Sequence, residues 1–140
     1  MKSKIIKSCD HIGIFTNNSR KLLNFYTKKL EFKKENESIL PKQIIKSIFG
    51  ISFDCKFIKL VSGNMMIEIF EPLSARMRKR INKSMGYNHW GYCVADKIQF
   101  VKRLKRKGVN IIEVKRNDHV VYFISDPDGN LIEIRECSKQ

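Results

Sequence analysis

The amino-acid sequence predicts one α+β domain made of two similar halves. Its 140 residues, of which 42% are apolar, are enough to bury one core. Short runs with strand-like alternation surround stretches whose apolar residues recur at helical spacing. The order strand, helix, strand, strand, strand occurs twice. We therefore predict a single domain over 1–140, with a first module over about 8–73, a linker over about 74–86 and a second module over about 87–137.

The first module is predicted from four apolar runs and one helical stripe. Asn17-Asn18-Ser19 is a helix-capping signal, and the apolar residues of Arg20–Leu30 follow it on one stripe. Ser62-Gly63-Asn64 is a favourable turn, so the runs on either side of it form a hairpin. Strands are predicted over Cys9–Phe15, Glu31–Asn36, Cys55–Val61 and Met65–Phe70.

The second module repeats this order. Asp96 is a suitable N-cap for a helix whose stripe is Ile98, Val101 and Leu104, and Gly108 is suited to end it. A turn over residues 125–130 joins the last two strands. Strands are predicted over Asn88–Ala95, Val109–Val114, Val120–Ile124 and Leu131–Glu136.

The modules differ by one insertion, Leu40–Ser52. Pro41 suits the start of a helix, Gly50 suits its end, and apolar residues lie between them. We expect a short extra helix here. It is either a lid over a site or a patch on otherwise exposed core.

The chain is strongly basic, with 28 Lys and Arg against 14 Asp and Glu and a formal net charge of +14. Such a balance suits nucleic acid, an anionic membrane or a polyanionic small molecule. The charges concentrate in residues 76–83 and 97–107, where they are more typical of solvated helix faces. No nucleic-acid motif with interleaved aromatic residues accompanies them, so we expect neither a nucleic-acid nor a membrane partner.

The cysteines and the N-terminal region indicate a cytoplasmic protein. The four cysteines, Cys9, Cys55, Cys93 and Cys137, form no CxxC motif, so we expect small buried hydrophobic residues rather than a zinc site or a redox pair. The basic start is followed by a polar segment where a signal peptide has its apolar stretch.

Both modules carry one histidine and one glutamate at equivalent positions. Each first strand contains His-x-Gly, with His11 in one module and His89 in the other. Each last strand carries a glutamate between isoleucines, Glu68 and Glu133. The histidine and glutamate are 57 residues apart in the first module and 44 in the second, and the difference equals the length of the Leu40–Ser52 insertion.

These side chains form a candidate metal site. Side chains alternate along a strand, so each histidine and glutamate faces away from the neighbouring apolar residues. If the two sheets curve toward each other, the four groups converge in one cleft and suit a divalent first-row metal with two open positions. An isolated glutamate on a β-strand usually faces solvent, and an isolated histidine on a β-strand is usually structural. The matched positions of these residues in the two modules favour a metal site instead. The candidate ligands are His11, Glu68, His89 and Glu133.

The same residues resemble the vicinal oxygen chelate superfamily, which includes glyoxalase I, methylmalonyl-CoA epimerase, fosfomycin-resistance proteins and extradiol dioxygenases. The resemblance covers residues 9–136. The segments in the style of the family are Asp10-His11-Ile12-Gly13, Asn24-Phe25-Tyr26, residues 67–72, His89 and residues 126–133.

The resemblance implies two βαβββ modules that form a cupped mixed sheet around a central cleft, a homodimer, and the four residues above as ligands of nickel, cobalt, zinc or manganese. A complete His-Glu-His-Glu set is similar to glyoxalase I (lactoylglutathione lyase) and close to the epimerase. Both remove a proton next to a metal-bound carbonyl, with Glu133 first and Glu68 second as candidate bases. The implied substrate is a small molecule such as a thiol adduct or an acyl-CoA.

Other functions stay open. Positions that hold glutathione in glyoxalase I are Phe15 and Pro72 here, and Ser52-Phe53-Asp54 stands where the epimerase has a second catalytic glutamate. A metal-free binding or resistance protein would use the same cup to hold a small aromatic molecule, stacked on Trp90, Phe53 or Tyr87.

Overall fold

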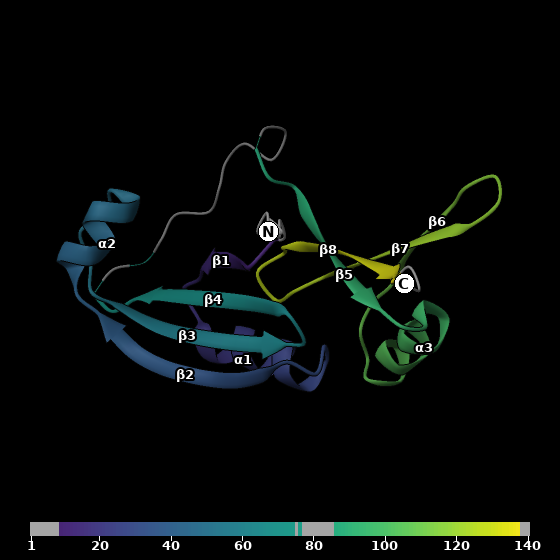
Figure 1. The fold of residues 1–140 in the computed structure, drawn as a ribbon, viewed down its shortest axis with the longest axis horizontal. Helices are drawn as coiled ribbons and strands as arrows, with labels where there is room; N and C mark the ends of the chain where they lie inside the picture. Colours follow the sequence, from purple (N-terminus) through teal and green to yellow (C-terminus); the bar gives the residue numbers. More distant parts are fainter. Residues whose placement is uncertain (1–8, 75, 77–85, 138–140) are drawn as a thin grey trace, which may run out of the picture. The chain divides into compact units, whose positions relative to one another are not determined.

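The computed structural model describes residues 9–74, 76 and 86–137, which form eight strands and three helices. They divide into two compact units. Unit 1 draws its residues from Met1–Ser19 and Glu31–Met77, and unit 2 from Arg20–Leu30 and Arg78–Gln140. The linker predicted over 74–86 lies mostly outside the described residues. Each unit contains one four-stranded mixed sheet, which confirms the predicted α+β class (Figure 1).

The sheet of unit 1 has the order β1-β4-β3-β2. β1 runs parallel to β4, whereas β3 is antiparallel to both of its neighbours. The parallel pair is central to the site, because it places the first and last strands of the module side by side. The strands are β1 (His11–Phe15), β2 (Lys33–Leu40), β3 (Cys55–Ser62) and β4 (Met65–Pro72).

The sheet of unit 2 repeats this topology with the order β5-β8-β7-β6. β5 is parallel to β8, and the other neighbours are antiparallel. The internal repeat predicted from the sequence is therefore confirmed strand by strand. These strands are β5 (His89–Val94), β6 (Ile112–Lys115), β7 (Val120–Ser125) and β8 (Leu131–Glu136).

Two helices, α1 (Ser19–Lys28) and α3 (Lys97–Arg106), belong to unit 2 except for the first residue of α1. Tyr92 on β5 contacts both regions: its hydroxyl donates to the carbonyl of Leu30, two residues after α1, at 3.1 Å, and its ring centre lies 5.8 Å from that of Phe100 in α3. The predicted caps of α3 are confirmed. Asp96 accepts a hydrogen bond from the amide of Gln99, and Gly108 adopts a positive φ of 77° after the last turn.

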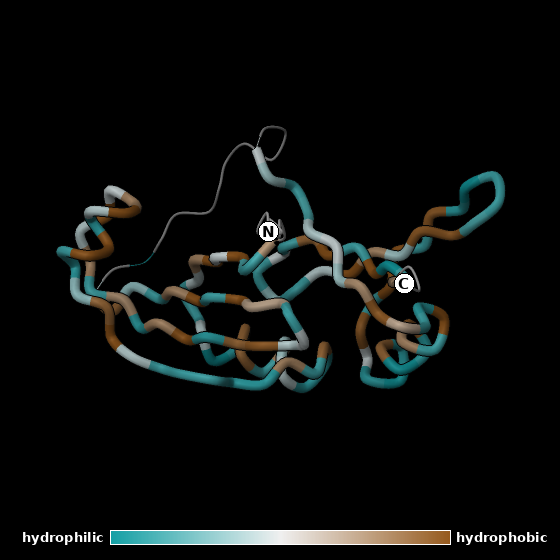
Figure 2. The backbone as a smooth tube through the Cα atoms, viewed as in Figure 1, coloured by the Kyte–Doolittle hydropathy of each residue, from teal (hydrophilic) through white to brown (hydrophobic). Residues whose placement is uncertain are grey.

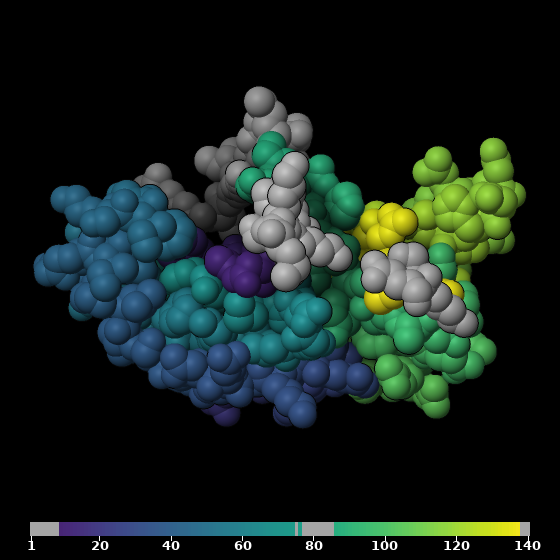
Figure 3. Space-filling model, in the orientation of Figure 1, coloured from purple at the N-terminus to yellow at the C-terminus, as the bar shows by residue number. Residues whose placement is uncertain are grey.

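The two outer strands differ most from their predicted bounds. β2 was expected over Glu31–Asn36 but spans Lys33–Leu40, and β6 begins at Ile112 rather than at Val109. Nearly all their side chains are exposed, so neither strand shows the alternation that predicts a half-buried strand (Figure 2 shows β2 as mostly hydrophilic). Figure 3 shows the β6–β7 hairpin standing out from the rest of unit 2.

The insertion of unit 1 forms α2 (Lys42–Phe49), as predicted. It follows Pro41 and ends at Gly50, which adopts the left-handed conformation and donates its amide to the carbonyl of Lys46. Ile45 is fully buried in a cluster with Cys55 and Phe70. The helix therefore covers one end of the sheet and patches core, while Ile48 on its other side is 65% exposed.

The contrast between Ile45 and Ile48 gives a prediction about α2. Ile45→Ala should lower the free energy of unfolding by about 3 kcal/mol, because it removes buried methyl groups and leaves a cavity beside Phe70. Ile48→Ala, on the exposed side of the same helix, should change it by less than about 0.5 kcal/mol. Urea denaturation measures both. Equal effects of the two variants would show that α2 does not pack through Ile45.

The expectation that the cysteines are buried and unpaired is wrong for three of them. Only Cys55 is buried, whereas Cys9 is exposed and free. Cys93 and Cys137 form a disulfide, with their Cα atoms 5.1 Å apart. The physical reason is the parallel pairing of β5 with β8, which extends to a hydrogen bond from the amide of Cys137 to the carbonyl of Val94 and brings two distant cysteines together.

Thiol labelling should report these environments. Iodoacetamide should modify Cys9 in the native protein, whereas Cys55 should react only after unfolding, because burial excludes the reagent and raises the pKa of its thiol. Cys93 and Cys137 should react only after reduction. Peptide mapping by mass spectrometry reads all four sites. Labelling of Cys55 in the folded protein would contradict its placement.

Among the described residues, no helix is both long enough and apolar enough to cross a membrane.

Candidate metal centre

In unit 1, the structure brings His11 and Glu68 together. His11 lies on β1 and Glu68 on the parallel neighbour β4, with Nε2 of the histidine 3.5 Å from Oε2 of the glutamate. Nδ1 of His11 lies 2.9 Å from Oδ2 of Asp10. This hydrogen bond, followed by the charge of Glu68, raises the pKa of His11 above its usual value.

Unit 2 contains the same arrangement. Nε2 of His89 on β5 lies 3.8 Å from Oε2 of Glu133 on β8. Nδ1 of His89 is hydrogen-bonded to the side-chain oxygen of Asn88. In both units, therefore, an acceptor on the preceding residue engages one ring nitrogen and the other ring nitrogen faces a carboxylate.

The strand register explains why the two pairs match. Gly13 on β1 is opposite Glu68, and Gly91 on β5 is opposite Glu133. Each histidine is two residues before its glycine and so faces the same side of the sheet. A Cβ at either glycine would make only ordinary contacts at 3.6 Å, with Phe70 or with Arg135. The glycines thus keep the space beside each glutamate free of a side chain.

The pairs fit a divalent ion as two sets of two ligands. Two donors bound to one ion at about 2.1 Å lie about 3.0–3.4 Å apart, so the observed 3.5 and 3.8 Å require small side-chain movements. An acceptor on the second ring nitrogen is the usual way in which proteins orient a histidine ligand. Within residues 9–74, 76 and 86–137, no three or more His, Cys, Asp or Glu side chains are already grouped to hold an ion.

Each glutamate has a cationic neighbour that the sequence reading did not single out. Arg135, two residues after Glu133 on β8, places its guanidinium 3.6 Å from Oε1 of that glutamate. Lys59 on β3 is in register with Glu68. The sequence could have indicated Arg135, because it lies two residues after Glu133 and so faces the same side of the strand. It could not have indicated Lys59, whose position beside Glu68 depends on the pairing of β3 with β4.

The surroundings of the two histidines differ. On the face of unit 1 that carries His11 and Glu68, Phe15 and Phe70 pack together with ring centres 5.3 Å apart. Phe49 of α2 packs against both, at 5.0 Å and 5.3 Å. In unit 2 the ring of His89 lies edge to face with Phe123, with centres 5.4 Å apart. The insertion therefore builds an aromatic wall on the His11 side of unit 1.

The entry into β8 is held by a buried carboxylate, Asp126. Its Oδ1 accepts hydrogen bonds from the amides of Asp128 and Asn130, both at 2.9 Å. Its Oδ2 accepts from the Tyr26 hydroxyl at 2.7 Å and from the Asn130 side chain at 2.8 Å. Burial, followed by the charge of Asp126, raises the pKa of Tyr26 well above its usual value. This network joins α1 to the turn that precedes Glu133.

Trp90 and Tyr87, two of the residues predicted to stack on an aromatic ligand, do not share one environment. Trp90 lies on the opposite side of β5 from His89 and packs against the rings of Tyr26 and Tyr92, at 6.5 Å and 5.8 Å. Tyr87 is 96% exposed. The structure thus uses Trp90 in the core of unit 2.

Each unit has a parallel pair of first and last strands, with a histidine and a glutamate facing each other across it. This repeat defines a class of proteins built from two similar modules. The family model of the Glyoxalase/Bleomycin resistance protein/Dioxygenase superfamily matches residues 8–134. The chain belongs to this superfamily, as the sequence resemblance implied. A search of curated proteins found no match.

Solved structures share the fold at low identity. A glyoxalase family protein from Enterococcus faecalis is 23% identical with a TM-score of 0.70, over 91% of this chain and 96% of that chain. The trypanothione-dependent glyoxalase I of Leishmania major is 19% identical with a TM-score of 0.66, over 94% and 87%. TnmS3, an antibiotic-binding protein from Streptomyces sp. CB03234, is 15% identical with a TM-score of 0.63, over 97% and 100%. The fold is thus shared by an enzyme and a binding protein.

Proposed function

We propose that the protein is a metal-dependent lyase or isomerase of the glyoxalase I-like type, which removes a proton next to a carbonyl group. The observation that carries the proposal is the matched His–Glu pair in each unit, with the other nitrogen of each imidazole held by Asp10 or Asn88. The residues that would hold one nickel, cobalt, zinc or manganese ion are His11, Glu68, His89 and Glu133. A bound ion of this kind supplies Lewis-acid stabilisation of the charge that develops on a carbonyl oxygen.

Proton transfer is assigned to Glu133, with Glu68 as the second candidate. Both side chains are largely buried, at 16% and 20% exposure, and the Arg135 guanidinium lies 3.6 Å from Oε1 of Glu133. The carboxylate takes the proton from the carbon beside the carbonyl, and the electron pair of the C–H bond moves into an enediolate. Return of the proton to the former carbonyl carbon, with the hydroxyl proton passing to the other oxygen, completes the isomerisation of a thiol adduct. Return of a proton to the opposite face of the original carbon completes an epimerisation.

The substrate class follows from this chemistry. A thiol adduct of a 2-oxoaldehyde carries an acidic C–H beside a carbonyl, as does an acyl-CoA with a 2-carboxyl group. The first corresponds to a lactoylglutathione lyase-like reaction and the second to an epimerase-like reaction. We further propose that the protein is a cytoplasmic homodimer. Analytical ultracentrifugation measures its oligomeric state.

Activity assays on the metal-loaded protein test the proposal. The wild type should convert a methylglyoxal–thiol adduct or exchange the 2-proton of methylmalonyl-CoA with deuterium, and Glu133→Gln should lower kcat by about 10²–10⁴-fold. Glu113→Gln is the matched control. It changes an exposed glutamate on β6, whose ion-pair partner is Lys105 of α3, and should keep full activity. Full activity of Glu133→Gln would assign the base elsewhere.

The alternative is a metal-free protein that binds a small aromatic molecule. Phe49 of the aromatic wall favours it, because its ring is exposed while it packs on Phe15 and Phe70, on the face of unit 1 that carries His11, and exposed ring surface suits stacking. Equilibrium dialysis with aromatic ligands separates the two functions. Binding that is independent of added metal and lost in Phe49→Ala supports the alternative.

A further inference from the structure

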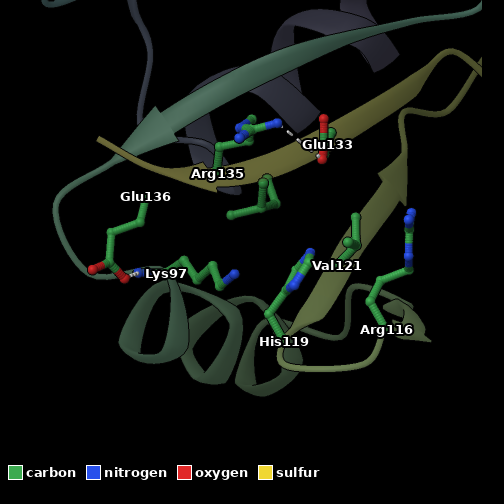
Figure 4. A pocket seen from close by; sticks show the side chains of 8 residues that line it. Lys97, Arg116, His119, Val121, Glu133, Arg135 and Glu136 are labelled. Atoms are coloured by element: carbon green, nitrogen blue, oxygen red, sulfur yellow. Dashed lines mark hydrogen bonds and ion pairs between the residues drawn. The ribbon is translucent and has the colours of Figure 1, made fainter. Parts of the chain in front are cut away.

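Unit 2 contains a pocket of about 380 Å³ beside Glu133. β7 and β8 pair only as far as Tyr122 and Ile134, and five of the lining residues, Val121 and residues 133–136, lie on these strands around the point where this pairing ends. Figure 4 shows the pocket open between β8, the start of α3 and the β6–β7 turn. Its lining consists of Lys97, Arg116, His119, Val121 and residues 133–136.

Three basic residues of the lining come from three different elements, and Figure 4 shows Arg135 turned toward Glu133. Lys97 begins α3, and its Nζ donates to the carbonyl of Val120 at 3.0 Å. Arg116 belongs to the turn after β6, where its amide donates to the carbonyl of His119 at 2.8 Å. Its guanidinium forms no ion pair with the part of the chain that the structure describes. Arg135 enters from β8.

The two acidic residues of the lining are already engaged. Oε2 of Glu136 lies 3.4 Å from the amide of Lys97, and Figure 4 shows this carboxylate directed toward that amide. Glu133 contacts Arg135 through Oε1 and His89 through Oε2. His119 is paired through Nδ1 with the exposed Asp118 at 2.5 Å. The cations of the pocket therefore exceed what its own acids neutralise.

We propose that this pocket binds an anionic group of the substrate, a phosphate or a carboxylate, through Lys97, Arg116 and Arg135. A guanidinium offers two parallel N–H donors to an oxyanion, and two of them with an ammonium suit a group with two or three oxygens. The inference rests on the proposed function at one point, the role of Glu133 in the reaction.

The position of the pocket defines the substrate class more closely. Glu133 forms part of the lining, so a molecule anchored by its anionic group extends from the pocket toward that carboxylate. Anchoring at a distance fixes the orientation of the reacting carbon and lowers the entropic cost of the reaction. The substrate is then a carbonyl compound with a phosphate or carboxylate, and a neutral analogue is a poor one.

Anion titration tests the pocket without reference to activity. Inorganic phosphate, and acetate in a separate series, are added to the full chain at low salt while NMR follows the arginine side-chain N–H signals and the backbone amides. The wild type should show saturable shifts confined to Lys97, Arg116 and the end of β8. Arg116→Gln/Arg135→Gln should weaken binding by about tenfold or more. The series that saturates at lower concentration identifies phosphate or carboxylate as the preferred group.

The matched control is Arg106→Gln/Lys102→Gln, which removes the same charge from exposed positions on α3 outside the pocket. It should change phosphate binding by less than about twofold, because exposed charges act weakly at a distance. Equal weakening by the two double variants, or shifts spread over all basic residues without saturation, would overturn the proposal. Circular dichroism checks that both variants are folded.

Metal content, measured on the same samples, separates this inference from the proposed function. A protein that binds metal but shows saturable shifts with neither phosphate nor acetate contradicts the pocket alone. A protein that binds phosphate in the pocket but takes up no divalent metal supports the anion site and contradicts the metal-dependent function. With both present, the arginine double variant should lose the preference for a 3-mercaptopropionate adduct of methylglyoxal over the neutral 2-mercaptoethanol adduct.

Discussion

Replacing His11 and Glu133 together with alanine should abolish metal binding. Each substitution removes one ligand from one of the two pairs, so neither unit keeps both of its donors. Inductively coupled plasma mass spectrometry on protein purified without chelator or affinity tag should find roughly one nickel, cobalt, zinc or manganese ion per wild-type chain. The double variant should bind at least about 100-fold more weakly, because even a single supporting group contributes 10–100-fold to affinity.

The double variant should still fold. Neither residue belongs to the buried apolar core, so the free energy of unfolding should change by less than about 1 kcal/mol. His119→Ala/Glu136→Ala is the matched control, because it removes one histidine and one glutamate from unit 2 outside the two pairs. Full metal content in the His11/Glu133 variant would show that the ligands are wrong. A wild type that takes up no added divalent metal would redirect attention to small aromatic ligands.

Asp126→Ala should lower the free energy of unfolding by about 3–5 kcal/mol. The carboxylate is 4% exposed and accepts four hydrogen bonds, two from backbone amides of the turn, one from Asn130 and one from the buried Tyr26 hydroxyl. Removing it leaves buried donors without an acceptor, which costs more than the bonds themselves contribute. Urea denaturation followed by circular dichroism measures the loss.

A double-mutant cycle isolates the link between Asp126 and α1. Tyr26→Phe alone should cost about 1–2 kcal/mol, because it removes one charge-assisted hydrogen bond and leaves the ring in place. In the Asp126→Ala background the same change should cost almost nothing. Equal costs in both backgrounds would show that the hydroxyl does not depend on this carboxylate.

Sequence patterns predicted most of the fold. Of the predicted stripe Leu22, Leu23, Tyr26 and Leu30, all but Leu23 are fully buried, because a helix that packs on a sheet needs one continuous apolar side. Leu23 is half-buried, and Ile98 of the stripe predicted for α3 is exposed. The capping residue of α3 and the glycine that ends α2 were also predicted correctly, since both act through local backbone geometry. β2 and β6 were misplaced because an exposed outer strand is held by backbone hydrogen bonds, which leave no side-chain pattern.

The candidate site was predictable in part. The internal repeat marked His11, Glu68, His89 and Glu133, and within each unit the structure places the histidine beside its glutamate. That both pairs share one ion stays a prediction. Asp10 and Asn88 had a visible signal, because each immediately precedes a repeated histidine. Arg116 and Lys97 had none, since a basic residue in a pocket and one on a solvated face look alike in a sequence.

The sequence by itself determined the repeat, the faces of the strands and the four candidate ligands, because each depends on spacing within a segment of a few residues. Only the tertiary structure decided which distant segments became neighbours. The parallel pairing of β5 with β8 joined Cys93 to Cys137, and the separation of β7 from β8 opened the cationic pocket. The physical reason is that strand pairing and side-chain packing are set by contacts between residues far apart along the chain, whose partners no local pattern names.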